Sequence, residues 1–158
     1  VVPALAPDHS FGRKTDGDDE WVYFSAPSPE AANDGQATYG YALAPIVLPE
    51  GHFFGMPTEV QCSAPQSGCI VRYTTDGSEP TTDAPVYESP IPIYATTCIR
   101  ARTFCPGLLP SVVISKTIFI DAHHRLPVVA LSTHPDNWWN WESGILVDGP
   151  HADPEWPH

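Results

Sequence analysis

Basic residues are scarce in this sequence: seven lysines and arginines stand against 19 aspartates and glutamates, which leaves a formal net charge of −12. Nucleic-acid-binding proteins draw much of their affinity from cationic side chains that release counterions from phosphates. Anionic membrane surfaces attract basic segments for the same reason. The charge therefore argues against nucleic acids and membrane surfaces as partners.

Long apolar runs are also missing, because no stretch approaches the roughly 18 apolar residues that cross a bilayer. We therefore expect no membrane insertion. The opening VVPALAPDHS lacks the charged start and apolar stretch of a signal peptide. A mature or excised chain would look the same, so this second absence does not place the protein in the cytoplasm.

Metal and catalytic motifs are absent as well. The cysteines, Cys62, Cys69, Cys98 and Cys105, form no CxxC pair of the kind that builds structural zinc sites. No HExxH motif, paired carboxylates or Ser-His-Asp order stands out. The sequence predicts no enzyme, no metal and no cofactor, and the cysteines are expected as disulfides or buried thiols.

Proline, in contrast, is abundant, with 19 residues at more than twice the usual frequency. Helices tolerate proline only in their first turn, so the chain should consist of strands and turns. Short alternating segments lie at 58–64, 69–75, 90–97, 98–105 and 111–120. This spacing predicts an all-β fold, a two-sheet sandwich of the immunoglobulin or fibronectin type over residues 45–120. The inward-facing residues should be Val60, Val71, Tyr73, Ile99 and Ala101. The arginines of the same segments, Arg72, Arg100 and Arg102, then lie on the opposite side of their strands.

The segments on either side look like partial β structure. WVYF (Trp21–Phe24) is a strand candidate within residues 1–33, and the small, polar residues 34–44 read as a linker. LPVVALST (126–133) is a continuous apolar run suited to a buried strand. Residues 135–149 predict one turn of helix followed by another strand.

Several motifs in fixed order carry a family resemblance. VRYTTDGSEPT (71–81), Tyr87, Pro90–Ile91, IRA (99–101) and the strand 111–120 together resemble the chitobiase/β-hexosaminidase C-terminal-type domain. The resemblance implies an immunoglobulin-like accessory module, without catalytic residues, found in secreted and surface proteins of bacteria. Its signature residues here are Tyr73, Thr74, Asp76, Gly77, Glu79 and Pro80.

The ends of the chain carry further resemblances. Residues 10–33 look like the end of a bacterial lamin-tail domain, and residues 126–158 resemble the opening of the CotH kinase-like family. The implied order is a lamin-tail end (1–33), a linker (34–44), the sandwich (45–120) and an incomplete CotH-like start (121–158). Kinase residues would lie beyond His158, so no kinase activity carries over.

Acidic loops and histidines invite metal-site readings that we weigh against simpler ones. Asp76, Glu79 and Asp83 share one loop, but calcium takes six to eight oxygen ligands, so turn chemistry is preferred. The run of Asp16, Asp18, Asp19 and Glu20 lacks the EF-hand pattern and is read as a solvated loop. His123 and His124 are read as linker residues.

Trp138, Trp139 and Trp141 have two interpretations. Tryptophan faces bind sugars, but they also anchor cores and interfaces. Because these residues fall within the CotH-like opening, we favour core or interface contacts for a domain that is mostly missing here. They would then be exposed in this chain.

The direction of the strands constrains the cysteines. Cys62, Cys69 and Cys105 should gather at one end of the sandwich, with their side chains pointing inward. Cys98 should lie alone at the other end. Cys98 and Cys105 cannot bridge along one strand, because seven steps of about 3.3 Å exceed disulfide reach. We expect at most one intramolecular disulfide, with Cys62–Cys69 favoured and Cys62–Cys105 next, and Cys98 unpaired or bonded to another chain.

Three functions remain open at this stage. The first is a structural spacer between neighbouring domains of an extracellular or cell-surface protein. The second is carbohydrate binding, suggested by the company of the family and by Tyr39, Tyr41 and Tyr87. The third is self-assembly, in which edge strands or residues 1–33 and 121–158 pair with another copy.

Overall fold

The computed structural model describes residues 3–33, 35–123 and 126–148. Within these ranges the chain forms three β-sheets and one turn of helix, α1 (Asp136–Trp139). The strands are β1 (Ser10–Arg13), β2 (Trp21–Phe24), β3 (Ala37–Thr38), β4 (Ile46–Leu48), β5 (Phe53–Phe54), β6 (Thr58–Ser63), β7 (Ile70–Thr74), β8 (Ile91–Ile93), β9 (Thr97–Phe104) and β10 (Ile114–Ile120).

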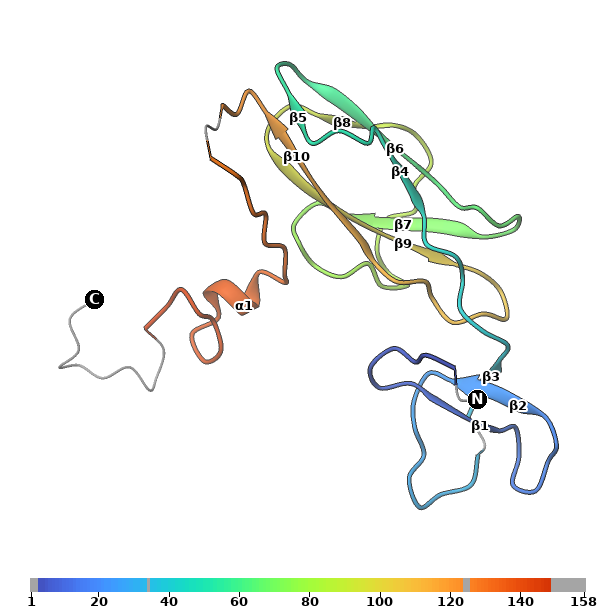
Figure 1. Cartoon of the computed structure of the whole chain (residues 1–158). Coiled ribbons are helices and arrows are strands. Elements are labelled where there is room, and N and C mark those ends of the chain that lie inside the picture. Colours follow the sequence, from blue (N-terminus) through green and yellow to red (C-terminus); the bar gives the residue numbers. More distant parts are fainter. Residues whose placement is uncertain (1–2, 34, 124–125, 149–158) are drawn as a thin grey trace.

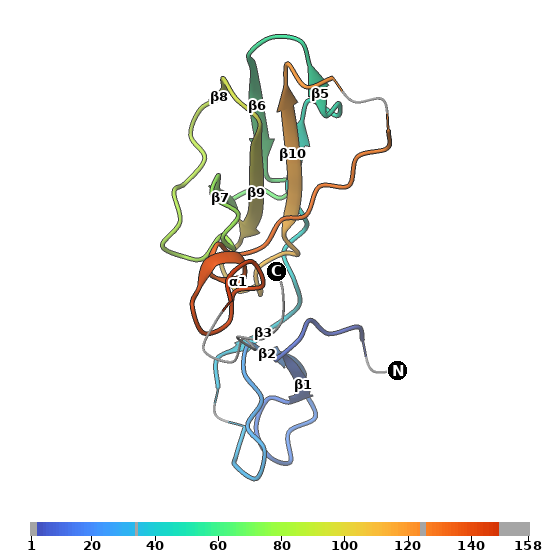
Figure 2. The same cartoon turned by 90° about the vertical axis from the view of Figure 1, so that its left-hand side faces the viewer.

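Two of the sheets face each other and make the sandwich (Figures 1 and 2). One sheet has the order β4-β6-β8, and the other has the order β5-β10-β9-β7. The first strand of the sandwich is divided between them, because β4 pairs antiparallel with β6 whereas β5 pairs parallel with β10. The chain therefore has an all-β, immunoglobulin-like sandwich, as the sequence predicts.

The core lies between these two sheets. Val60, Ile99, Ala101 and Ile118 are fully buried, and Val71 is 4% exposed. Tyr73 is partly buried and packs against this cluster. The predicted inward face is therefore correct, because alternation along β6, β7 and β9 turns every second side chain toward the facing sheet. Each buried valine or isoleucine contributes about 1.5–3 kcal/mol by leaving water.

The N-terminal region forms a separate antiparallel sheet, β1-β2-β3, at one end of the sandwich (Figure 1). Val22 and Phe24 are buried on one face of β2, which contains the predicted strand. Residues 34–44 are predicted as a linker. Among the described residues of this stretch, Ala37 and Thr38 form β3 and pair with Phe24 and Tyr23 of β2.

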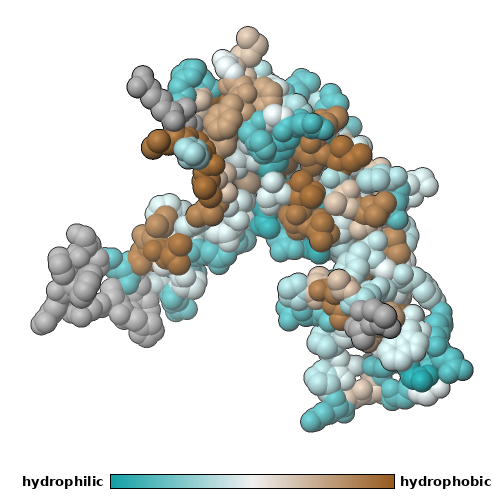
Figure 3. Space-filling model, in the orientation of Figure 1, coloured by the Kyte–Doolittle hydropathy of each residue, from teal (hydrophilic) through white to brown (hydrophobic). Residues whose placement is uncertain are grey.

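The segment after β10 departs from the expectation. Residues 126–133 form no strand, and none of their backbone amides bonds to another backbone group of the described ranges. Leu126, Val129 and Leu131 are 80%, 83% and 75% exposed, and apolar side chains line this segment in Figure 3. A continuous apolar run is buried only when sheets or helices cover both of its faces, and here one side meets the sandwich and the other meets solvent.

The expected single turn of helix is present as α1, but none of its residues is buried. The strand predicted after it is absent from residues 140–148, which form turns. Part of the CotH-like stretch, residues 149–158, lies outside the described residues. The described segment runs back along the sandwich from the end of β10 to α1 (Figure 2).

Candidate functional site

The signature residues of β7 and the following loop build a tight turn. Gly77 has a φ of 88°, a conformation that glycine adopts without strain. One carboxylate oxygen of Asp76 accepts hydrogen bonds from the Ser78 backbone N–H at 2.9 Å and from its hydroxyl at 2.6 Å. These two bonds lower the pKa of Asp76. The Thr74 hydroxyl closes the turn by donating to the Ser78 carbonyl at 2.6 Å.

Three arginines hold this loop, residues 75–86, on the outer face of β7 and β9. Arg72 donates to the Ala84 carbonyl, and Arg100 donates to the Gly77 carbonyl at 2.9 Å. Arg102 donates to Glu79 Oε1 at 2.7 Å and to the Ser111 carbonyl at 2.7 Å. The two separated motifs, TTDGSEP and IRAR, therefore form one structural unit. Alternation placed the arginines on the outer face, but only the fold identifies their partners.

The loop also returns beside β7. The Tyr73 N–H donates to the Pro85 carbonyl at 3.1 Å, and the Tyr87 N–H donates to the Val71 carbonyl at 2.8 Å. Pro80 is among the fully buried side chains. Tyr87 packs edge-on against Tyr73, with ring centroids 6.5 Å apart, and is partly buried against the core.

The disulfide joins Cys69 to Cys105, so the favoured pairing of Cys62 with Cys69 is wrong. The register of β7 and β9 explains the outcome: Ile70 faces Phe104, so the next pair outward places Cys69 opposite Cys105, with Cα atoms 4.4 Å apart. Cys62 lies on β6 in the other sheet and is 6% exposed. Burial raises the pKa of the Cys62 thiol to about 11. Cys98 is a free thiol, as expected.

An N-terminal joint connects the sandwich to the β1-β2-β3 sheet. The Leu109 N–H donates to the Gly40 carbonyl at 2.8 Å, and the Ala42 N–H donates to the Leu109 carbonyl at 2.8 Å. Ala42 and Leu109 are 5% and 3% exposed. The Tyr41 ring packs against Tyr23 at 5.5 Å between centroids. Tyr41 thereby contacts both parts of the molecule and is not a free sugar-binding ring.

A C-terminal joint connects the sandwich and the loop of residues 75–86 to the segment after β10. The Cys98 thiol donates to the Ser132 hydroxyl at 3.1 Å. The Thr133 carbonyl approaches Gly77 so closely that a Cβ atom there would lie only 2.6 Å away. A cavity of about 240 Å³ is lined by loop and segment residues, including Trp138 and Trp139. Trp139 and Trp141 are 64% and 61% exposed, so the tryptophans do not form a buried cluster here.

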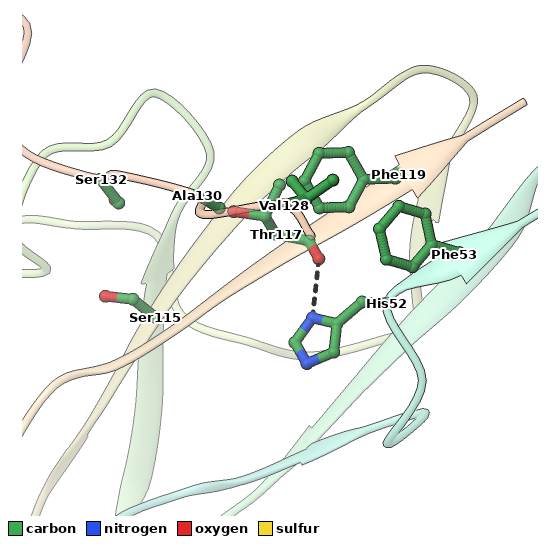
Figure 4. A pocket seen from close by; sticks show the side chains of 8 residues that line it. All are labelled: His52, Phe53, Ser115, Thr117, Phe119, Val128, Ala130 and Ser132. Carbon is green, nitrogen blue, oxygen red and sulfur yellow. Dashed lines mark hydrogen bonds between the residues drawn. The ribbon is translucent and has the colours of Figure 1, made fainter. Parts of the chain in front are cut away.

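A second cavity, of about 390 Å³, lies beside β10 (Figure 4). His52 bonds through its ring Nδ1 to the Thr117 carbonyl at 3.0 Å, and Phe53 stacks on Phe119 with centroids 4.7 Å apart. Val128 and Ala130 of the C-terminal segment line its other side. This cavity therefore lies between the sandwich and residues 126–133.

Asp18, Asp19 and Glu20 of the acidic run have local contacts. Glu20 pairs with Lys14 at 2.9 Å, and Asp19 lies 3.4 Å from Arg13. Asp18 accepts a hydrogen bond from the Glu20 N–H at 3.1 Å, which lowers its pKa. In the described ranges no three His, Cys, Asp or Glu side chains converge on a point where they could hold a metal.

The histidines after β10 form no larger cluster among the residues described. His123 Nε2 lies 3.4 Å from Asp121, and both side chains are well exposed. His124 falls outside the described residues. The one helix described has four residues, so it is far too short to traverse a membrane.

The fold defines a class, the immunoglobulin-like sandwich, and a comparison with known families is more specific. Residues 48–115 match the family described as the chitobiase/beta-hexosaminidase C-terminal domain. This family is a non-catalytic accessory domain. The match covers the loop, its three arginines and the disulfide, and leaves out both flanking segments. No curated protein and no solved structure shows significant similarity to the chain.

Proposed function

We propose that the chain is a non-catalytic structural module of a secreted or cell-surface bacterial protein, which holds the segments on either side of it in a defined relative position. The observation that carries this proposal is the pair of joints. Each joint uses specific contacts between the sandwich and its neighbour, Leu109 with residues 40–42 on one side and Gly77 and Cys98 with residues 132–133 on the other.

The arrangement favours a folded-back connection between the neighbouring segments over an extended, end-to-end one. The chain leaves the sandwich at the end of β10 and then runs back along it toward α1 (Figure 2). The loop that carries the family signature meets this returning segment at Gly77. The loop therefore has a mechanical role in the proposal: the three arginines fix it to the sheet, and it in turn supports the next part of the chain.

The proposed partners are neighbouring domains of the parent protein. By sequence resemblance these are a lamin-tail-like domain before residue 33 and a CotH-like domain that includes residues 126–158. An oxidising, extracellular location is supported by the disulfide, because such bonds persist mainly outside the cytosol. The net charge of −12 supports the exclusion of nucleic acid.

Residual dipolar couplings of the isotopically labelled chain test the proposal. Amides of β1–β2, of the sandwich and of residues 126–148 should fit one common alignment tensor, because rigid joints make the parts tumble together. Separate tensors for the sandwich and either neighbour would contradict the proposed fixed arrangement.

Calorimetric titration with chitin fragments and other glycans should show no binding tighter than about 1 mM. A saturable micromolar complex would favour carbohydrate binding, for which Tyr39 is 63% exposed.

Self-association is a second candidate function, favoured by one observation. The described part of the C-terminal segment exposes eight large apolar side chains: Leu126, Val128, Val129, Leu131, Trp139, Trp141, Ile145 and Leu146. Large exposed apolar patches often mark sites of interaction with another protein. Sedimentation velocity over a roughly hundredfold range of concentration decides between the two, because a spacer stays monomeric and an assembling subunit grows.

A further inference from the structure

We infer that the Cys69–Cys105 disulfide is a clamp for the N-terminal joint: it sets the orientation of the β1-β2-β3 sheet relative to the sandwich. The inference rests on the proposed function and deepens it, because it names the device that makes one of the two joints rigid. The disulfide lies outside the core and beside the joint.

The disulfide adds little order to the folded sandwich, although it stabilises the fold by restricting the unfolded chain. It joins neighbouring strands of one sheet, where β7 and β9 are already paired from Ile70–Phe104 to Thr74–Arg100. It does not connect the two sheets, and neither cysteine belongs to the buried core cluster. A crosslink between strands that are already paired acts mainly on the loops that continue beyond it.

Both of these loops hold the joint. The turn after β9 begins at Cys105, whose carbonyl accepts the Leu108 N–H at 3.3 Å, and continues to Leu109. Leu109 exchanges two backbone hydrogen bonds with residues 40–42, each 2.8 Å long. The loop before β7 ends at Cys69 and carries Gln66, whose side-chain oxygen accepts the Leu43 N–H at 2.7 Å.

Gln66 lies between the two loops. Its Oε1 atom lies 3.6 Å from Cys105 Sγ while it holds the Leu43 N–H. Residues 40–43 are thus hydrogen-bonded both to the turn after β9 and to the loop before β7. The disulfide connects these two loops. If the disulfide is absent, the two loops can separate, and the hydrogen bonds that hold residues 40–43 are lost.

The joint transmits this constraint to the N-terminal sheet through Tyr41. The Tyr41 hydroxyl accepts the Ala6 N–H at 3.1 Å and lies 2.7 Å from His9 Nδ1. Its ring stacks on His9 and meets Tyr23 edge-on, with centroids 5.5 Å apart in both pairs. A fixed backbone at Tyr41 therefore positions His9, which directly precedes β1, and Tyr23 of β2.

The test compares alignment tensors of the full chain in the wild type, the double variant C69S/C105S and the control C98S. In the wild type and in C98S, amides of β1–β2 and of the sandwich should fit one tensor. In the double variant the sandwich should keep its tensor, while the order of the β1–β2 amides falls by roughly twofold or more, as expected of a hinge.

The outcomes separate the clamp from the proposed function. One shared tensor in both the wild type and C69S/C105S would overturn the clamp and leave the spacer standing. Separate tensors already in the wild type would overturn the spacer and the clamp together. If the double variant does not fold, Q66A decides, since it keeps the disulfide and the core. It should loosen the β1–β2 amides in the same direction, and an unchanged tensor in Q66A would then overturn the clamp.

Discussion

Strand β10 and the segment 126–133 are two apolar stretches separated by only a few residues, and they lie in opposite environments. In β10, Ile118 is fully buried, with β9 beside it and the β4-β6-β8 sheet across from it. In the segment, Val129 is 83% exposed and the backbone has no described strand partner. Apolar, β-branched composition is common to both stretches. The difference shows that a strand forms where a neighbour supplies hydrogen bonds and a second layer supplies burial.

The strongest test of this contrast replaces one side chain in each region. Ile99→Ala should lower the free energy of unfolding by about 2–5 kcal/mol, because it leaves a cavity in a fully buried site. Val129→Ala should change it by less than about 0.5 kcal/mol, because that side chain is already in solvent. Urea denaturation measures both. Equal losses would mean that residues 126–133 are packed in solution.

Removal of the disulfide should have the next largest effect. The bridge closes a loop with a sequence separation of 36, and its loss in C69S/C105S should cost about 2–4 kcal/mol through the entropy of the unfolded chain. Cys98→Ser, which alters only the contact with Ser132, should leave the urea midpoint nearly unchanged. A larger effect from Cys98→Ser would show that the C-terminal joint matters more for stability than the sandwich crosslink.

The arginine contacts rank below the disulfide. Arg102→Ala should cost about 1–3 kcal/mol, because its side chain is 19% exposed and its guanidinium bonds both Glu79 and the Ser111 carbonyl. Lys14→Ala, which breaks the exposed Lys14–Glu20 pair, should give no measurable change. Thermal unfolding of the two variants makes the comparison. An Arg102 variant as stable as the wild type would mean that the loop does not depend on this anchor.

The smallest effect is expected at Asp76, on the loop surface. Hydrogen bonds from Ser78 lower the pKa of Asp76 in the folded state below its ordinary value, so the ionised form stabilises the fold above the unfolded pKa. This contribution disappears as the pH falls through the lower, folded value. Asp76→Ala should cost about 0.5 kcal/mol at neutral pH and almost nothing at a pH low enough to protonate the folded carboxylate. Urea midpoints at both pH values give the answer, and a pH-independent difference would contradict it.

Local patterns determined much of this protein by themselves. Alternation in β6, β7 and β9 defined the core face, because the side chains of a strand point to opposite sides in turn. The glycine at position 77 and the aspartate before it defined the turn, because few residues other than glycine accept its backbone conformation. The motifs of residues 71–120 also identified the family that the comparison matched.

Partners across the fold were decided only by the tertiary structure. The sequence placed three cysteines at one end of the sandwich, but the choice of Cys69 and Cys105 depended on which strands are neighbours and in what register. It placed Arg72, Arg100 and Arg102 on one face without showing that a loop covers them. It also suggested a buried strand at 126–133, where the fold supplies a surface on one side only. Hydrophobicity and periodicity are properties of a segment, whereas pairing and burial depend on what lies beside it.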